Sequence, residues 1–498
     1  MLTLAPIFSD HAVLQRGKPI RIFGTADAAS VTVRLGCQET TAAVRSDGKW
    51  TALLPPMTGT DPMLLYVTDG ASTLVREDIL LGEVWLCGGQ SNMELVLRDS
   101  RDPEPALAEC ASLPIRLYHV GKRGFMDEQF YEEERRSCWQ LPSADACQWW
   151  TAVGYHFAAE LTKKLGCPVG LVECNCGGTS ASAWISEEML RSNAVGQAYL
   201  DDYARGMKGL TDEEACRNYL NYCEYQGAWQ KRIDDLYREH PDTPWATALE
   251  ICGENQYPGP PAPNNPLRPH GLYDTMLTRI TPYTLKGVLW YQGEADEIRP
   301  EGYAQLLTTL IRQWRRDFMD QELPFLIVQL PMHAYADNTE DRRWPVLRLA
   351  QEEVFRNVKN TGLAVILDCG EFNEIHPKEK RTPAHRLFLQ AMERVYRHPT
   401  DNNTAPLVRG IVPEDGGIRV YFWHVDKGLE LRGESGFEVC DAAGNWHPAQ
   451  AEIVDVSLAV RSEAVPHPVG VRYAWVGYGE VTLFTREGMP AAPFCRMV

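Results

Sequence analysis

The sequence predicts an α/β protein in which a mostly parallel sheet, covered by helices on both faces, is flanked by N- and C-terminal β-sandwich domains. Apolar strands alternate with amphipathic helices through the middle of the chain. Both ends instead contain short alternating runs separated by turn residues, such as SDGKW near the start and DAAGNW near the end. Alternation of strand and helix favours a parallel sheet, whereas closely spaced short strands favour antiparallel sandwiches.

Length and charge limit the class of protein. The chain has 498 residues, more than one hydrophobic core of about 250 to 300 residues can organise. Its net charge of −18 argues against nucleic acid and anionic membranes as partners, because both attract positive patches. The first residues lack the basic start and apolar run of a signal peptide, which predicts a cytoplasmic protein. Nothing in the sequence sets the oligomeric state.

Changes in residue pattern predict three domains. Residues 1–80 are expected to form the N-terminal β-sandwich, residues 81–400 the α/β domain, and residues 401–498 the C-terminal β-domain. A polar, Tyr- and Glu-rich stretch at about 190–265 interrupts the α/β pattern and ends in PGPPAPNNP. We expect this stretch to form a helical insertion followed by a loop.

The central domain contains five apolar segments that are expected to be strands. They cover residues 83–86, 169–173, 287–291, 325–330 and 364–368. Apolar side chains recur at helical spacing from Tyr303 to Phe318 and from Val153 to Leu165, which predicts two helices packed on the sheet.

The end of the first of these strands carries a candidate nucleophile. In an open parallel sheet, ligands bind beyond the carboxyl ends of the strands. Gly88 and Gly89 allow a tight turn there, and Ser91 follows where a helix can begin. Backbone N–H groups at a helix start can hold an oxyanion, although a serine in this place is more commonly a simple helix cap.

Two further strand ends carry groups that could stabilise negative charge. Gly177 and Gly178 follow the second strand, where a backbone N–H could approach a reacting oxygen, although such a pair is also a common turn. Gln292, Glu294 and Asp296 follow the third strand. The Gln292 amide is a candidate oxyanion donor, with a role in fixing its own loop as the alternative.

A candidate general base follows the last strand. His376 lies in a short loop before Pro377. A serine early in the chain and a histidine late, both at carboxyl strand ends, form the arrangement expected of a nucleophile and its base.

At these residues the chain resembles a known family. GEVWLCGGQSNMEL, WYQGEAD and IHPKEK look like segments of the sialate O-acetylesterase family of SGNH hydrolases, and further similar segments cover most of the chain. The resemblance implies a flavodoxin-like SGNH sheet, with Ser91 as nucleophile and His376 as base. It also implies an oxyanion hole formed by the Ser91 backbone N–H, Gly178 and Gln292.

The implied function is a serine esterase that removes O-acetyl groups from carbohydrates, above all from O-acetylated sialic acids, through an acetyl-serine intermediate and water. Gln90 and Glu294 are expected to contact the substrate. Arg386 could pair with a sialic acid carboxylate, or instead form a salt bridge within its own helix. No metal or organic cofactor is needed. An acetylxylan or other polysaccharide acetylesterase is the alternative within this chemistry, and a non-catalytic carbohydrate-binding protein is the alternative of another class.

One position departs from the pattern of many SGNH enzymes, which have aspartate three residues before the histidine. This chain has Asn373 there. The group that orients His376 could be the Glu374 side chain, a backbone carbonyl, or the more distant Asp368. We favour the carbonyl, because a separation of two residues should make it hard for the Glu374 side chain to fold back onto the ring.

Overall fold

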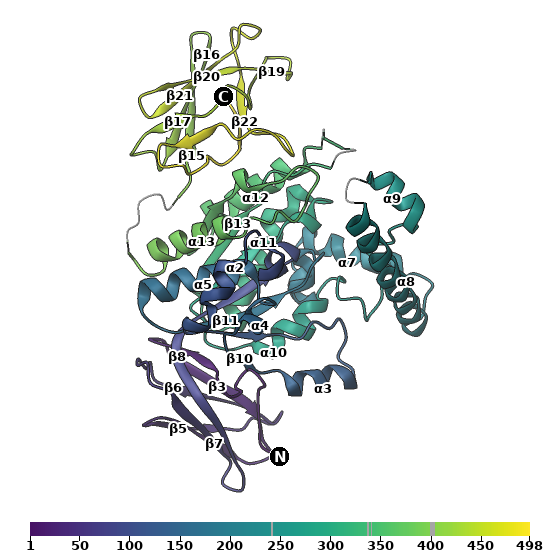
Figure 1. The fold of residues 1–498 in the computed structure, drawn as a ribbon, viewed down its shortest axis with the longest axis vertical. Coiled ribbons are helices and arrows are strands. Elements are labelled where there is room, and N and C mark those ends of the chain that lie inside the picture. Colours follow the sequence, from purple (N-terminus) through teal and green to yellow (C-terminus); the bar gives the residue numbers. More distant parts are fainter. Residues whose placement is uncertain (241–242, 336–337, 340, 399–403) are drawn as a thin grey trace. The chain divides into compact units, whose positions relative to one another are not determined.

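A computed structural model describes residues 1–240, 243–335, 338–339, 341–398 and 404–498. It is a mixed α/β structure with one large mixed sheet and additional β-sheets (Figure 1). The chain forms two compact units. The first comprises Met1–Val120, Ser137–Gly177 and Ile280–Val498, and the second comprises Gly121–Arg136 and Gly178–Arg279.

The N-terminal domain consists of short, mainly antiparallel strands, as its residue pattern predicts. Their bounds are β1 (Thr3–Leu4), β2 (Val13–Gln15), β3 (Ile20–Thr25), β4 (Ser30–Leu35), β5 (Gln38–Ala43), β6 (Lys49–Leu54) and β7 (Met63–Thr68). One sheet has the order β1-β3-β6, and β4 pairs with both β5 and β7. Along β6, exposed and buried residues alternate strictly, which gives each sheet one apolar face.

A single strand joins this domain to the central sheet. Strand β8 runs from Thr73 to Gly89. Its first part pairs antiparallel with β7, and its second part pairs in parallel with β11 and β12. The last exposed position is Glu77, and from Ile79 onward every residue of the strand is buried, so both of its faces are covered. The change in residue pattern near residue 80 therefore marks a change of environment within one strand (Figure 1).

The central sheet has the order β10-β9-β11-β8-β12-β13-β14. All neighbours in it are parallel except β10 (Trp139–Gln140). The other strands are β9 (Ile115–His119), β11 (Val169–Asn175), β12 (Gly287–Tyr291), β13 (Phe325–Gln329) and β14 (Thr361–Val365). The last strand begins and ends three residues earlier than predicted, and it stops at Val365 because residues 367–369 form a 3-10 turn. The sequence analysis missed β9, since Arg116 interrupts its apolar run.

Two pairs of helices cover the sheet. Helix α5 (Ala152–Leu165) packs against α13 (Arg381–Arg394), and α11 (Tyr303–Asp317) packs against α12 (Arg343–Asn357) (Figure 1). Both helices predicted from apolar spacing are present as α5 and α11. Shorter helices of this unit are α1 (Ser91–Glu94), α2 (Glu104–Glu109) and α4 (Ala144–Cys147). The Thr151 side chain caps α5 by accepting from Gly154 N–H.

The second unit is helical where it is described. Its helices are α3 (Glu128–Arg136), α6 (Glu187–Arg191), α7 (Ala194–Met207), α8 (Asp212–Glu239) and α9 (Trp245–Cys252), and α10 (Thr278–Ile280) begins at its end. A capping box between Thr211 and Glu214 begins α8. Trp229 and Ile233 on α8 pack against Ala248 and Cys252 on α9. Within the described ranges, no helix is both long and apolar enough to cross a membrane.

The C-terminal domain is built from two four-stranded antiparallel sheets and one strand pair. The sheets have the orders β15-β16-β21-β20 and β19-β18-β22-β24, and β17 pairs with β23. The bounds are β15 (Leu407–Glu414), β16 (Gly417–Trp423), β17 (Leu429–Leu431), β18 (Phe437–Cys440), β19 (Trp446–Pro448), β20 (Gln450–Val454), β21 (Ser457–Arg461), β22 (Gly470–Tyr473), β23 (Leu483–Thr485) and β24 (Phe494–Met497).

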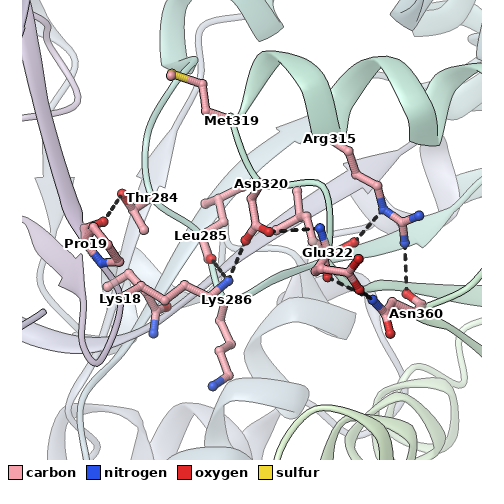
Figure 2. Close-up of polar contacts among 12 residues, drawn as sticks. Lys18, Pro19, Thr284, Leu285, Lys286, Arg315, Met319, Asp320, Glu322 and Asn360 are labelled. Atoms are coloured by element: carbon pink, nitrogen blue, oxygen red, sulfur yellow. Dashed lines mark hydrogen bonds and ion pairs between the residues drawn. The ribbon is translucent and has the colours of Figure 1, made fainter. Parts of the chain in front are cut away.

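The N-terminal domain is joined to the amino ends of the central strands (Figure 2). Lys18 Nζ donates to the Leu285 carbonyl at 2.9 Å, two residues before β12 begins, and to Asp320 Oδ2 at 2.8 Å. Thr284 Oγ1 donates to the Pro19 carbonyl at 3.0 Å. These contacts lie at the edge of the sheet opposite to the strand ends that were predicted to carry the chemistry.

At the same edge, one buried cation orders two loops (Figure 2). Arg315 on α11 donates from Nε to the Leu323 carbonyl at 3.0 Å. It also donates from NH2 to the carbonyls of Lys359 at 2.7 Å and Asn360 at 3.2 Å. Leu323 precedes β13, and Lys359 and Asn360 precede β14, so Arg315 fixes the starts of both strands.

We expect Arg315→Met to lower the free energy of unfolding by about 2 to 4 kcal/mol, because it removes a buried charged donor from the Leu323 carbonyl and part-buried hydrogen bonds to Lys359 and Asn360. The matched control is Arg316→Met, whose side chain is half exposed and pairs with its neighbour Asp317. This change should cost less than about 1 kcal/mol. Thermal and urea unfolding of the two variants would measure the difference, and equal losses would contradict the role given to Arg315.

Candidate active site

The turn after β8 places Ser91 at the start of α1. Gly89 has a φ of +133°, and an added Cβ would lie 2.0 Å from the Tyr291 carbonyl oxygen. Only glycine fits this close approach between β8 and β12. Gln90 N–H then donates to the same carbonyl at 3.1 Å, and Ser91 is the first helical residue. The N–H groups of a first helical turn have no acceptor within the helix, so they can meet an anion.

The structure brings the predicted nucleophile and base together. His376 Nε2 lies 2.8 Å from Ser91 Oγ, although 285 residues separate them in sequence. Ser91 follows β8 and His376 follows β14, both at carboxyl ends of the parallel sheet. Ser91 is half-buried, and 42% of the His376 side chain is exposed, so a substrate can reach the pair. The hydroxyl can donate its proton to the ring directly.

Partial burial lowers the pKa of His376 below its ordinary value, because desolvation disfavours the charged imidazolium. The carboxylate of Glu374 opposes this shift, whereas the ammonium group of Lys380 adds to it. The ring is therefore neutral at neutral pH, which is the form that accepts a proton.

The Glu374 side chain folds back toward the ring, contrary to the argument from sequence separation. Its Oε1 accepts from the backbone N–H of His376 at 2.7 Å and lies 3.8 Å from Nδ1. The fold-back is possible because the carboxylate is held by the backbone of the same loop. A distance of 3.8 Å is an ion-pair contact but exceeds hydrogen-bond length.

Asp368 is committed to another partner. Both of its carboxylate oxygens accept from the guanidinium group of Arg386, with Oδ2 at 2.8 Å from NH2. Arg386 NH1 also donates to the Val365 carbonyl at 2.9 Å. This geometry removes support both for Asp368 as the group that orients His376 and for Arg386 as a ligand of a substrate carboxylate. Arg386 therefore forms a structural salt bridge, as the alternative reading expected. Its partner Asp368 lies outside helix α13, however, and not within the same helix.

Gln292 is turned into the protein. Its side chain is fully buried, and the two N–H bonds of its amide point to Gln90 Oε1 at 3.2 Å and Asp296 Oδ2 at 2.7 Å. The amide oxygen accepts from Tyr303 Oη at 2.8 Å. Gln90 Oε1 also accepts from Ala295 N–H at 3.2 Å. The geometry therefore supports the alternative that Gln292 fixes its loop, and it supports neither an oxyanion role for Gln292 nor a substrate contact by Gln90.

The chain passes from the first unit to the second between the two glycines of the pair. Gly177 N–H donates to the Glu94 carboxylate, and an added Cβ at Gly177 would lie 3.4 Å from Ser91 Cβ. Gly178 has a φ of +71° and belongs to the second unit, where its carbonyl accepts from Tyr257 Oη at 2.9 Å. The role of the Gly178 N–H in an oxyanion hole stays a prediction.

A buried polar chain that the sequence analysis did not identify joins the three motifs. Asn92 Oδ1 accepts from Lys380 Nζ at 2.7 Å. Asn92 Nδ2 donates to Glu294 Oε1 at 2.6 Å and to the carbonyl of Ile375, the residue before His376, at 2.9 Å. Asn92 and Lys380 are polar residues of the serine and histidine motifs, and this was the signal available in the sequence. Their positions along the chain did not show that they bind each other.

Burial shifts the titration of both charged ends of this chain. It lowers the pKa of Lys380 to about 8, and it raises the pKa of Glu294. Both side chains are almost fully buried. Glu294 therefore holds Asn92 in place, and the geometry does not present it to a substrate as expected. Among the residues that the structure describes, no group of three His, Cys, Asp or Glu side chains could hold a metal ion.

Comparisons with known proteins agree with the resemblance noted in the motifs. Residues 264–378 match the family described as carbohydrate esterase, sialic acid-specific acetylesterase. The sialate O-acetylesterase of Mus musculus is 26% identical over 99% of this chain and 94% of its own length. The Homo sapiens protein is 25% identical over 99% and 92%. A crystal structure of a carbohydrate acetylesterase from Xanthomonas citri aligns with a TM-score of 0.78 at 28% identity, covering 99% of both chains.

NMR titration should give His376 a pKa below about 6.5, its ordinary value. Glu374→Gln should lower this pKa further, since the carboxylate raises it. The control Glu379→Gln changes a carboxyl group of the same segment that accepts from Thr382 N–H at 2.9 Å, and it should leave the His376 pKa unchanged. An unchanged or higher pKa in Glu374→Gln would contradict the electrostatic role of Glu374.

Proposed function

We propose that this chain, a carboxylic ester hydrolase similar to sialate O-acetylesterases, removes O-acetyl groups from carbohydrates, and that Ser91 and His376 perform the hydrolysis through an acetyl-serine intermediate. The observation that carries the proposal is the 2.8 Å contact between Ser91 Oγ and His376 Nε2. The topology, with Ser91 after β8 and His376 after β14, supports assignment to the SGNH type.

In the first half of the reaction, His376 Nε2 takes the proton of Ser91 Oγ while this oxygen attacks the acetyl carbonyl carbon. The C=O bond becomes a C–O⁻ bond, and N–H groups at the start of α1, including that of Ser91, stabilise the negative charge. Gly178 N–H is a second proposed donor. Collapse of the oxyanion breaks the bond to the sugar oxygen, which receives the proton from His376 and leaves as a hydroxyl group.

In the second half, His376 takes a proton from water, and the resulting nucleophile attacks acetyl-Ser91. Collapse returns the proton from His376 to Ser91 Oγ and releases acetic acid, which loses its proton to water and becomes acetate. The imidazolium forms twice in the cycle, and the carboxylate of Glu374, 3.8 Å from Nδ1, favours it each time. We therefore assign Glu374 a modest electrostatic role in place of a full triad hydrogen bond.

We propose O-acetylated sialic acids as the substrates, because the curated relatives are named for sialate and match along nearly the whole chain. A polysaccharide acetylesterase stays the alternative, since the structural relative is described only as a carbohydrate acetylesterase. The comparisons set aside the non-catalytic alternative, because they support a carboxylic ester hydrolase.

Ser91→Ala should keep the fold and lower kcat for p-nitrophenyl acetate by about 10⁴ or more, as removal of such a serine typically does. His376→Ala should behave in the same way, and the double variant should be little worse than either single one, because the two groups act as a unit. A serine-directed phosphonate should block the wild-type protein. Wild-type turnover by Ser91→Ala would rule out the proposed mechanism.

Glu374→Gln is the matched variant within the same loop, and it should stay within about tenfold of wild-type kcat because the carboxylate makes no hydrogen bond to Nδ1. A loss of several thousandfold at unchanged Tm would instead make Glu374 a full third member of a triad.

The choice of sugar is tested by acetate release from an O-acetylated sialic acid and from acetylated xylan at equal ester concentration. We expect kcat/KM for the sialic acid to be at least about tenfold higher, a difference of about 1.4 kcal/mol in the transition state. The reverse order would favour the polysaccharide alternative, and release from neither substrate would contradict both.

A further inference from the structure

The C-terminal domain contacts the edge of the central sheet at which Ser91 and His376 meet. The loop after β22 reaches the segment that follows the carboxyl end of β13. His333 N–H donates to the Gly477 carbonyl at 2.8 Å. An added Cβ at Gly477 would lie 2.7 Å from the His333 carbonyl oxygen, so the two backbones pack as closely as glycine allows.

A buried arginine fixes this contact. Arg348 on α12 is fully buried, and its guanidinium group donates to four backbone carbonyls. Two belong to Leu330 and Pro331 after β13, and two belong to Val476 and Gly477 of the C-terminal loop. Burial lowers the pKa of Arg348 to about 9. Because one cation satisfies carbonyls of both segments, the C-terminal loop is held rigidly against the catalytic domain.

The loop that carries His376 rests on the same segment. Asn373 N–H donates to the Ala334 carbonyl at 3.1 Å, next to the residue that binds Gly477. Glu371 and Glu374 face each other across a tight turn, with Phe372 at its tip. The position of the base is thereby linked through residues 333–334 to the C-terminal domain.

Two partly exposed aromatic rings contact each other where these loops come together. The rings of Phe372 and Tyr478 lie 5.4 Å apart at 59°. Phe372 is 50% exposed and Tyr478 is 39% exposed. The two rings lie against each other, so they present one apolar surface to solvent, and Phe372 lies four residues before His376.

We propose that Phe372 and Tyr478 form a sugar-binding subsite, so that the C-terminal domain supplies part of the active site. The apolar C–H face of a pyranose ring can pack on such rings, and Phe372 belongs to the same loop as the base His376. This proposal rests on the proposed function. It assigns the two rings a role in binding the sugar, separate from the chemistry at Ser91.

Steady-state kinetics with two esters test the subsite. The first substrate is whichever of the O-acetylated sialic acid and acetylated xylan the wild type cleaves faster. The second is ethyl acetate, which has no ring to stack. Tyr478→Ala and Phe372→Ala should each raise KM for the sugar ester about fivefold to tenfold with kcat within about twofold, because they remove binding and leave the chemistry intact. Hydrolysis of ethyl acetate should be unchanged.

Two variants serve as controls. Tyr478→Phe keeps the ring and should keep the wild-type KM. Tyr421→Ala removes an aromatic residue that is 43% exposed on β16 of the same domain. It should leave KM and kcat unchanged for both esters. An unchanged KM for the sugar ester in both alanine variants would overturn the subsite. Equal losses of activity on both esters would also overturn it, because they would indicate a structural role for the two rings.

Neither result would affect the assignment of Ser91. Absence of hydrolysis of both esters by the wild type would instead contradict the proposed function itself.

Discussion

The geometry of the candidate active site depends on one buried side-chain amide. Asn92 follows the serine and binds the residue that precedes the histidine, since its Nδ2 donates to the Ile375 carbonyl. The same amide is held by Glu294 after β12 and by Lys380 at the start of α13. A buried amide must satisfy its donors and its acceptor, so it fixes the relative positions of three segments that are far apart in sequence.

The polar motif residues largely face inward. Gln90 and Gln292 bind each other, and Arg386 binds Asp368, so these side chains hold the loops around Ser91 and His376. This arrangement is physically reasonable, because unpartnered polar groups beside a reacting centre would cost free energy and allow the loops to move. Preorganised loops in turn keep the nucleophile and base within hydrogen-bonding distance before substrate arrives.

The two β-domains contact opposite edges of the central sheet. Lys18 of the N-terminal domain binds near the amino ends of the strands, whereas Gly477 of the C-terminal domain binds beyond the carboxyl end of β13. In parallel sheets the carboxyl edge carries the chemistry. The N-terminal contact therefore acts on stability, and only the C-terminal contact lies where it can influence catalysis.

Local patterns in the sequence were enough to predict the five apolar strands of the central sheet, helices α5 and α11, and the tight turn before Ser91. Periodic burial identifies the strands and helices that pack, and glycines identify tight turns, so these features need no knowledge of distant partners. The strand β9 was missed because Arg116, which interrupts its apolar run, finds its partners His11 and Asp78 only through the fold. The place of β14 was missed because the apolar run continues into the 3-10 turn at residues 367–369.

The partners of the polar side chains were decided by tertiary structure alone. Asn92 and Lys380 are 288 residues apart, and nothing local distinguishes an amide that binds a buried lysine from one that binds substrate. The same holds for Gln292, predicted as an oxyanion donor and found bonded to Gln90 and Asp296. Sequence determines which chemical groups are present at each strand end. Because hydrogen bonds are short and directional, only the packed structure determines which of those groups remain free to react.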